Sequence, residues 1–232
     1  MKVLLTGFDP FGGESVNPAF EAIKLLPDTI AGAEIVKVEI PTEFTRSISC
    51  VEAAIKEHNP DVVIDVGQAG GRACVTVEKV GINLADARIP DNAGEQPSDE
   101  PLQADGPTAY FATIPVKAMV QNVREHGLPC HVSFTAGTYV CNCVMYNVLH
   151  LCATKYPNIR AGASPYFCFR TPNRYPNEKI RIPAAVALPL RHGGIGTDPP
   201  RRPRAERPVG IRHRPQLHRD NAGSGHPDGR HA

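Results

Sequence analysis

Residues 62 to 71 read VVIDVGQAGG, a nearly continuous β-branched apolar run that ends in a glycine-rich segment. Such a run is typical of a parallel strand covered on both faces, because it lacks the alternation of a half-exposed strand. Pro60 and Asp61, just before it, indicate a turn that leads into the strand. The stretch predicts a buried strand over 62–66. The glycines after it are compatible with a tight turn or with a phosphate cradle.

Strand and helix patterns alternate outward from this run. The expected strands and extended segments cover 2–6, 34–40, 75–83 and 130–135, and the expected helices cover 17–26, 44–58, 116–127 and 139–153. Residues 84–113, rich in Asp, Pro and Gly, predict a long irregular loop. Past Arg160 we predict neither strand nor helix. This order predicts an α/β fold, a three-layer sandwich with a doubly wound, mostly parallel sheet flanked by helices.

The seven cysteines have no regular spacing and form no Cys-x-x-Cys pair. This pattern indicates neither a disulfide framework nor a zinc ribbon, and it favours a reducing compartment. The amino terminus turns polar too early for a signal peptide, and no run is apolar enough to span a membrane. We therefore expect a cytoplasmic protein with no metal, no cofactor and no membrane partner.

Charge divides the chain into two parts. The net charge of +1 combines a strongly basic tail with an acidic body, since residues 161–232 hold 13 Lys and Arg against 5 Asp and Glu. We predict one α/β domain over 1–162 and an irregular, basic, Pro/Arg/Gly-rich tail over 163–232. An alternative function follows, in which an inactive domain carries a tail that binds acidic partners or nucleic acid. No aromatic interleaving supports nucleic-acid binding.

Cys141 is the candidate nucleophile. It falls in the first turn of a predicted helix that follows a strand through a small-residue turn, where unpaired amides favour thiolate over thiol. The alternative is a buried structural thiol, the commoner fate of a cysteine. Cys143 lies about 200° further round the helix and is predicted to be core.

Base and orienting groups for this thiol are harder to identify. Residues His58, His126, His131 and His150 are all poorly placed relative to Cys141. Glu78 lies in an alternating, otherwise apolar stretch, and its position alone favours a solvent-facing carboxylate.

Four separated segments resemble pyroglutamyl-peptidase I, the pyrrolidone-carboxylate peptidase family of cysteine peptidases. They are LTGFDPFGG (5–13) with Asn17 and Pro18, VGQAGGR (66–72), VEKVGIN (77–83) with DARIPDN (86–92), and SFTAGTYVCN (133–142). The resemblance covers residues 1 to about 162 in constant order and spacing.

The resemblance implies a cysteine omega peptidase that removes an N-terminal pyroglutamyl residue from peptides through a thiolate acyl-enzyme. It implies Cys141 as nucleophile and Glu78 as the acidic residue that orients a histidine. It also implies a substrate pocket built from Phe8, Phe11, Gln68 and Tyr139, and a homotetramer. Aromatic faces and a few backbone hydrogen bonds suit a flat, neutral lactam.

The family's histidine has no match in this chain. The resemblance implies it about 24 residues after the nucleophile, following an Ala-Gly pair, to complete the triad. Ala161 and Gly162 are present, but residues 163–171 read ASPYFCFRT. Loss of the histidine predicts impaired activity. A second hypothesis is a frameshift, because the next reading frame of these codons permits a His-Leu-Pro strand.

Overall fold

The computed structural model describes residues 1–69 and 74–166. The predicted tail over 163–232 lies outside the described residues from position 167 onward, so its irregularity and its binding function stay predictions. No helix in the described segments is long and apolar enough to cross a membrane.

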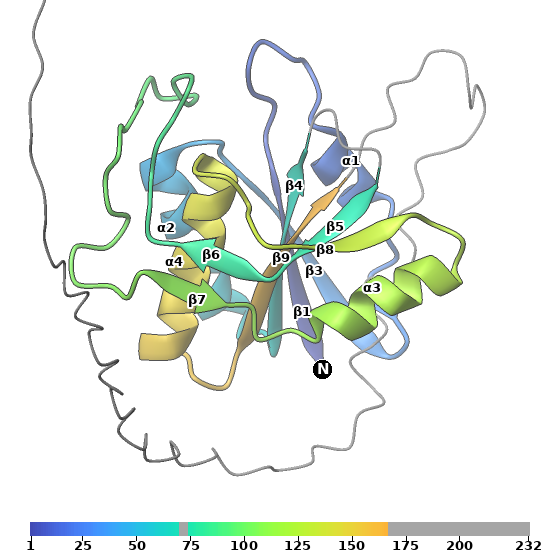
Figure 1. The fold of residues 1–232 in the computed structure, drawn as a ribbon. Coiled ribbons are helices and arrows are strands. Elements are labelled where there is room, and N and C mark those ends of the chain that lie inside the picture. Colours follow the sequence, from blue (N-terminus) through green and yellow to red (C-terminus); the bar gives the residue numbers. More distant parts are fainter. Residues whose placement is uncertain (70–73, 167–232) are drawn as a thin grey trace, which may run out of the picture. The chain divides into compact units, whose positions relative to one another are not determined.

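A five-stranded sheet forms the centre of the fold (Figure 1). Its order is β2-β3-β1-β4-β9, and only the edge strand β2 runs antiparallel to its neighbour. The bounds are β1 Lys2–Phe8, β2 Thr29–Ile30, β3 Ala33–Ile40, β4 Val62–Gln68 and β9 Arg160–Tyr166. The expectation of a doubly wound, mostly parallel α/β sheet is therefore confirmed.

Within residues 1–69 and 74–166, four helices flank the strands, at α1 Pro18–Lys24, α2 Phe44–His58, α3 Val116–Glu125 and α4 Val140–Thr154. Figure 1 shows α2 and α4 together on one side of the sheet and α1 on the other. Asn17 caps α1 by accepting a hydrogen bond from the Ala19 amide at 3.0 Å. Asn59, in the left-handed region with φ 45°, ends α2 where the sequence predicts.

Two small sheets lie beside the main one. Strands β5 (Val75–Glu78) and β8 (Cys130–Ser133) pair in parallel, and β6 (Val80–Ile82) pairs with β7 (Ala109–Phe111) in antiparallel fashion. Strand β5 packs against β9, and Ser164 Oγ donates to the carbonyl of Thr76 at 3.0 Å. Residues 84–113 are mainly loop, as predicted, apart from β7.

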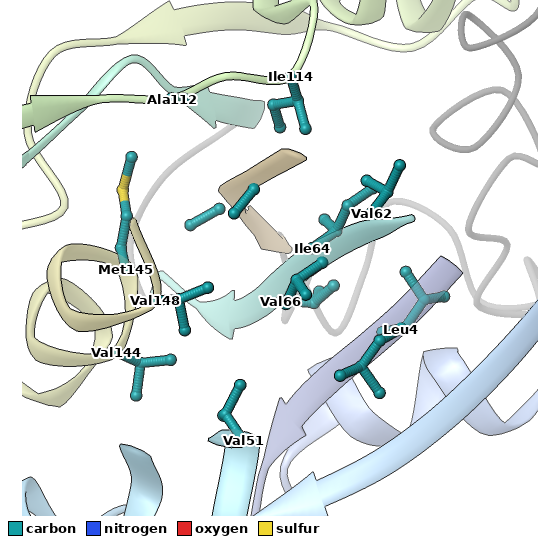
Figure 2. Packing of buried hydrophobic residues seen from close by; sticks show 14 of the residues in the cluster. Leu4, Val51, Val62, Ile64, Val66, Ala112, Ile114, Val144, Met145 and Val148 are labelled. Atoms are coloured by element: carbon teal, nitrogen blue, oxygen red, sulfur yellow. The ribbon is translucent and has the colours of Figure 1, made fainter. Parts of the chain in front are cut away.

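The hydrophobic core fills both faces of the sheet. Figure 2 shows Val144 and Val148 of α4 pointing toward β4, with Val51 of α2 and Leu4 of β1 nearby. Helix α4 is apolar almost all round because α2, β6, β7, β4 and β9 surround it. Because α4 is packed on so many sides, its first turn has a fixed position over the end of β4.

One expectation is wrong past Arg160. Residues 160–166 form β9, which pairs with β4 from Val62↔Arg160 to Gln68↔Tyr166. The residues Ala161 to Ser164 have little intrinsic strand propensity, and the exposed edge of β4 supplies the hydrogen-bonding partners that fix them as a strand. The strand crosses position 162, where the sequence predicts the end of the domain.

Candidate functional site

Cys141 lies in the first turn of α4, and its sulfur lies beside Gly67 near the carboxyl end of β4. Tyr139 is the N-cap residue, and its carbonyl accepts hydrogen bonds from the amides of Asn142 and Cys143 at 3.0 and 3.1 Å. A Cβ on Gly67 would stand 2.9 Å from Cys141 Sγ. The sulfur thus rests against the backbone of β4, near the positive end of the α4 dipole.

Asn142 holds the first turn of α4 in place from its buried side. Its side chain is fully buried, accepts a hydrogen bond from the Ile82 amide at 3.0 Å, and donates to the carbonyls of Ile82 and Leu84 at 2.9 and 3.0 Å. A buried amide with three backbone partners locks the first turn of α4 onto β6. This role of Asn142 was not predictable from the sequence, because an Asn beside a candidate nucleophile gives no signal of its partners.

The other thiols of α4 differ from Cys141. Cys143 is buried, as predicted, and burial raises its pKa to about 12. Burial also raises the pKa of Cys152 to about 12. Both stay protonated and unreactive at neutral pH, whereas Cys141 is half-buried.

Aromatic side chains gather beside the sulfur. Phe8 at the end of β1 places its ring 3.6 Å from the Cβ position of Gly67, on the Cys141 side. The Phe11 and Tyr139 rings lie 6.3 Å apart, and Phe44 meets Tyr139 edge-on at 5.5 Å. Phe44 was not among the predicted site residues, so its place in this cluster is a finding of the structure. Together these rings form an apolar wall near the thiol.

Tyr139 also takes part in the electrostatics of the site. Burial raises the pKa of its hydroxyl, and the charges of Asp91 and of a Cys141 thiolate act in the same direction. The hydroxyl therefore stays protonated and donates to the carbonyl of Pro90 at 3.1 Å.

Glu78 ends β5 and has no exposed surface. The expectation of a solvent-facing carboxylate from its position alone is therefore wrong, because the elements packed around β5 cover both of its faces. Thr76 Oγ1 donates to Glu78 Oε1 at 3.3 Å. Gln68, half-buried, ends β4 next to Gly67.

Each histidine of the described segments contacts groups other than Cys141. His150 Nδ1 lies 3.0 Å from the Tyr110 hydroxyl, and His131 Nδ1 lies 3.0 Å from Arg124 Nη2. His126 Nδ1 bonds the Asn122 carbonyl at 2.8 Å, and His58 Nε2 lies 3.9 Å from Glu57 Oε1. These contacts agree with the expectation that the histidines at these positions are poorly placed.

The register of β9 identifies the position opposite the sulfur. Gly67 pairs with Pro165, so the chain has a proline in the strand position directly beside the glycine that Cys141 Sγ contacts. Position 165 also lies where the sequence resemblance implies a histidine. Within residues 1–69 and 74–166, no group of three or more His, Cys, Asp or Glu side chains is arranged to hold a metal ion.

Comparisons with known proteins agree with this arrangement. The family model for pyroglutamyl peptidases matches residues 1–170. A pyrrolidone-carboxylate peptidase of Enterococcus faecalis is 67% identical over 162 residues, which make up 70% of this chain and 76% of that protein. A pyrrolidone-carboxylate peptidase of Levilactobacillus brevis is 60% identical over 162 residues, 70% of this chain and 79% of that protein.

Solved structures give the same result. Pyroglutamyl peptidase I from Bacillus amyloliquefaciens superposes with a TM-score of 0.71 at 47% identity, covering 73% of this chain and 81% of that one. Pyrrolidone carboxyl peptidase from Thermococcus litoralis superposes with a TM-score of 0.69 at 39% identity, covering 72% and 76%. The thiol at the start of α4 lies against the end of β4, and the chain shares its fold and sequence with these enzymes. This chain therefore belongs to the pyroglutamyl peptidase family.

Proposed function

We propose that this chain is a cysteine omega peptidase that hydrolyses the bond after an N-terminal pyroglutamyl residue, with Cys141 as nucleophile. The observation that carries the proposal is the position of Cys141 Sγ, half-buried at the amino end of α4 and in contact with Gly67. Family membership supports the substrate class.

The reaction proceeds in two steps. The Cys141 thiolate attacks the carbonyl carbon of the peptide bond that follows the pyroglutamyl ring. The C–N bond of that peptide bond breaks as the leaving amine takes a proton. Water then attacks the thioester, which releases pyroglutamate and returns the thiol. In this proposal Glu78 is the carboxylate that would orient the histidine of a complete triad, and Phe8, Phe11, Tyr139 and Gln68 surround the lactam ring. The neutral ring needs no charged partner, which suits an apolar aromatic wall.

The rate is proposed to be low. The position opposite Gly67 holds Pro165, which has neither an acidic nor a basic side chain, so the proton shuttle of a Cys-His pair is missing there. Loss of one member of such a triad commonly lowers the rate by several powers of ten.

We also propose one catalytic domain over 1–162, a homotetramer of this domain, and a cytoplasmic location. The cysteines at 50, 74, 130, 143 and 152 are thiols, which supports a reducing compartment. Light scattering of the purified chain tests the tetramer.

The experiment for the activity is release of a fluorescent amine from its pyroglutamyl amide. We expect slow release by the wild-type chain and none by Cys141→Ala, while Cys74→Ala, which removes another half-buried thiol, matches the wild type. Release that persists in Cys141→Ala would overturn the assignment of the nucleophile.

A further inference from the structure

Three loops at the aromatic end of the sheet meet at Asp9, which follows β1. Asp9 Oδ1 accepts hydrogen bonds from the Thr42 amide at 2.7 Å and from Asn92 Nδ2 at 3.1 Å. The Asp9 carbonyl accepts from Thr42 Oγ1 at 3.1 Å and from Asn17 Nδ2 at 3.0 Å. This residue therefore joins the loop after β1, the loop before α2 and the loop of residues 86–96.

Three consecutive residues of that last loop each bind a different aromatic segment. The Pro90 carbonyl accepts from the Tyr139 hydroxyl at 3.1 Å, and buried Asp91 accepts from the Phe44 amide through Oδ2 at 2.8 Å. Asn92 Nδ2 donates to Asp9 Oδ1 and, at 2.9 Å, to the Pro10 carbonyl, next to Phe11. Residues 90–92 thus connect the segments that carry Tyr139, Phe44 and Phe11.

Asn92 is the member of this group that reaches Phe11. The segment after Phe11 turns sharply, since Gly12 and Gly13 adopt φ values of 63° and 81° and one turn bond runs from the Glu14 amide to the Phe11 carbonyl. Both hydrogens of the Asn92 amide point to oxygens on either side of the Asp9–Pro10 peptide bond. The backbone of Asn92 is itself held, because its amide donates to the Thr42 carbonyl at 3.0 Å.

We propose that Asn92 is a positioning residue that sets the separation of Phe11 and Tyr139, and so the affinity of the aromatic wall for a lactam ring. The proposal rests on the proposed function, which makes these two rings part of the substrate pocket. Asn92 touches neither the sulfur nor the reacting carbonyl, so it acts on ring binding and leaves the thiol unchanged. Its side chain is exposed, so replacing it leaves the core intact.

The test separates ring binding from thiol chemistry. Iodoacetamide alkylates Cys141 in the full-length chain, and added free pyroglutamate slows that alkylation when it occupies the pocket. The two readouts are the unprotected alkylation rate and the pyroglutamate concentration that halves it. Asn92→Asp keeps the size of the side chain, removes both donors and sets a carboxylate against Asp9. Asn92→Ala removes the side chain, and Gln121→Ala, an exposed amide on α3, is the matched control.

We expect Asn92→Asp and Asn92→Ala to raise the half-protecting concentration at least about tenfold, equivalent to about 1.4 kcal/mol. The unprotected rate should change less than about twofold, and Gln121→Ala should match the wild type in both readouts. Protection in both Asn92 variants equal to that of Gln121→Ala would overturn the positioning role alone. Absence of protection in the wild-type chain would overturn the lactam pocket itself, and the positioning role with it.

Discussion

The sulfur of Cys141 occupies the space that a side chain at position 67 would need. The ideal Cβ of residue 67 lies 2.9 Å from Cys141 Sγ, closer than such atoms approach in real structures. Glycine at 67 therefore serves the thiol, because its backbone φ is not one that requires glycine.

Replacing Gly67 tests this relationship. We expect Gly67→Ala to slow alkylation of Cys141 several-fold, since the sulfur must leave its position at the end of α4. Overpacking should also lower the free energy of unfolding by about 1–3 kcal/mol. The matched control is Gly7→Ala, whose Cβ would meet Ile23 and Phe20 of α1 at the same 2.9 Å. An equal effect of both substitutions on the alkylation rate would contradict the prediction.

The six cysteines among the described residues should react in a defined order. We expect iodoacetamide to label Cys141 first, and Cys130, Cys143 and Cys152 last, because burial raises the pKa of these three thiols. Cys50 and Cys74 are half-buried like Cys141 but do not lie in the first turn of a helix, so they control for exposure. Peptide mapping by mass spectrometry after brief labelling gives the order. Faster labelling of Cys50 or Cys74 would count against an activated Cys141.

A histidine at position 165 should increase catalysis. The pairing of Gly67 with residue 165 brings that position beside the contact of Cys141 Sγ with β4. We expect Pro165→His to raise the rate of pyroglutamyl amide hydrolysis by about 10²–10⁴, the usual contribution of a positioned acid–base group. Tyr166→His, one register step further and paired with Gln68 instead of Gly67, should give no gain. Equal rates for the two variants would contradict the prediction.

Asn142 should be important for stability. Its buried amide makes three hydrogen bonds to the backbone of Ile82 and Leu84. Asn142→Ala removes all three bonds, and of the three backbone groups the Ile82 carbonyl keeps its bond from the Leu84 amide, so we expect a loss of about 2–4 kcal/mol in the free energy of unfolding. Urea denaturation measures it, with Gln121→Ala as the exposed control. A loss below about 1 kcal/mol would show that water replaces the amide.

Asp65 should make stability depend on pH. Burial raises the pKa of this carboxyl from 3.8 to about 7, against the opposing effect of a 2.7 Å hydrogen bond from Thr6 Oγ1. Its Oδ2 has no hydrogen-bond partner among the residues that the structure describes. The folded state therefore keeps a proton that the unfolded state loses above about pH 4, and the stability from this group falls as pH rises from about 4 to 7.

The comparison with Asp65→Asn isolates this effect. Urea unfolding at pH 5, 6 and 8 should show the wild type losing stability relative to the variant, by at most about 1.4 kcal/mol per pH unit, with no further change above pH 8. Other carboxylates contribute equally to both proteins. Parallel stability profiles for the two would show that Asp65 is ionised in the fold.

Local patterns predicted the elements that depend on their own sequence. Helix α2 spans 44–58 as expected, and α4 begins one residue after its predicted start, because periodicity and turn residues set both. Strand β9 was not predictable, since its pairing with β4 and not its composition makes it a strand. The burial of Glu78 likewise depends on elements distant in sequence that pack around β5.

The site was predictable only where it depends on local sequence. The position of Cys141 at the start of a helix followed from its neighbours in the chain. The approach of its sulfur to Gly67, the edge-on contact of Phe44 with Tyr139 and the bridge made by Asn92 join distant segments. No single-sequence pattern encodes such contacts, because each depends on how loops from different strands come together.

The pairing of β9 with β4 also has a consequence for biosynthesis. The ribosome makes β4 and the whole of α4 before Arg160 emerges, so a nascent chain carries an open β4 edge next to the helix that holds Cys141. Unpaired edges and newly exposed thiols are sites of aggregation and oxidation. Until β9 docks, the future reaction centre is thus open to both kinds of damage in the growing polypeptide.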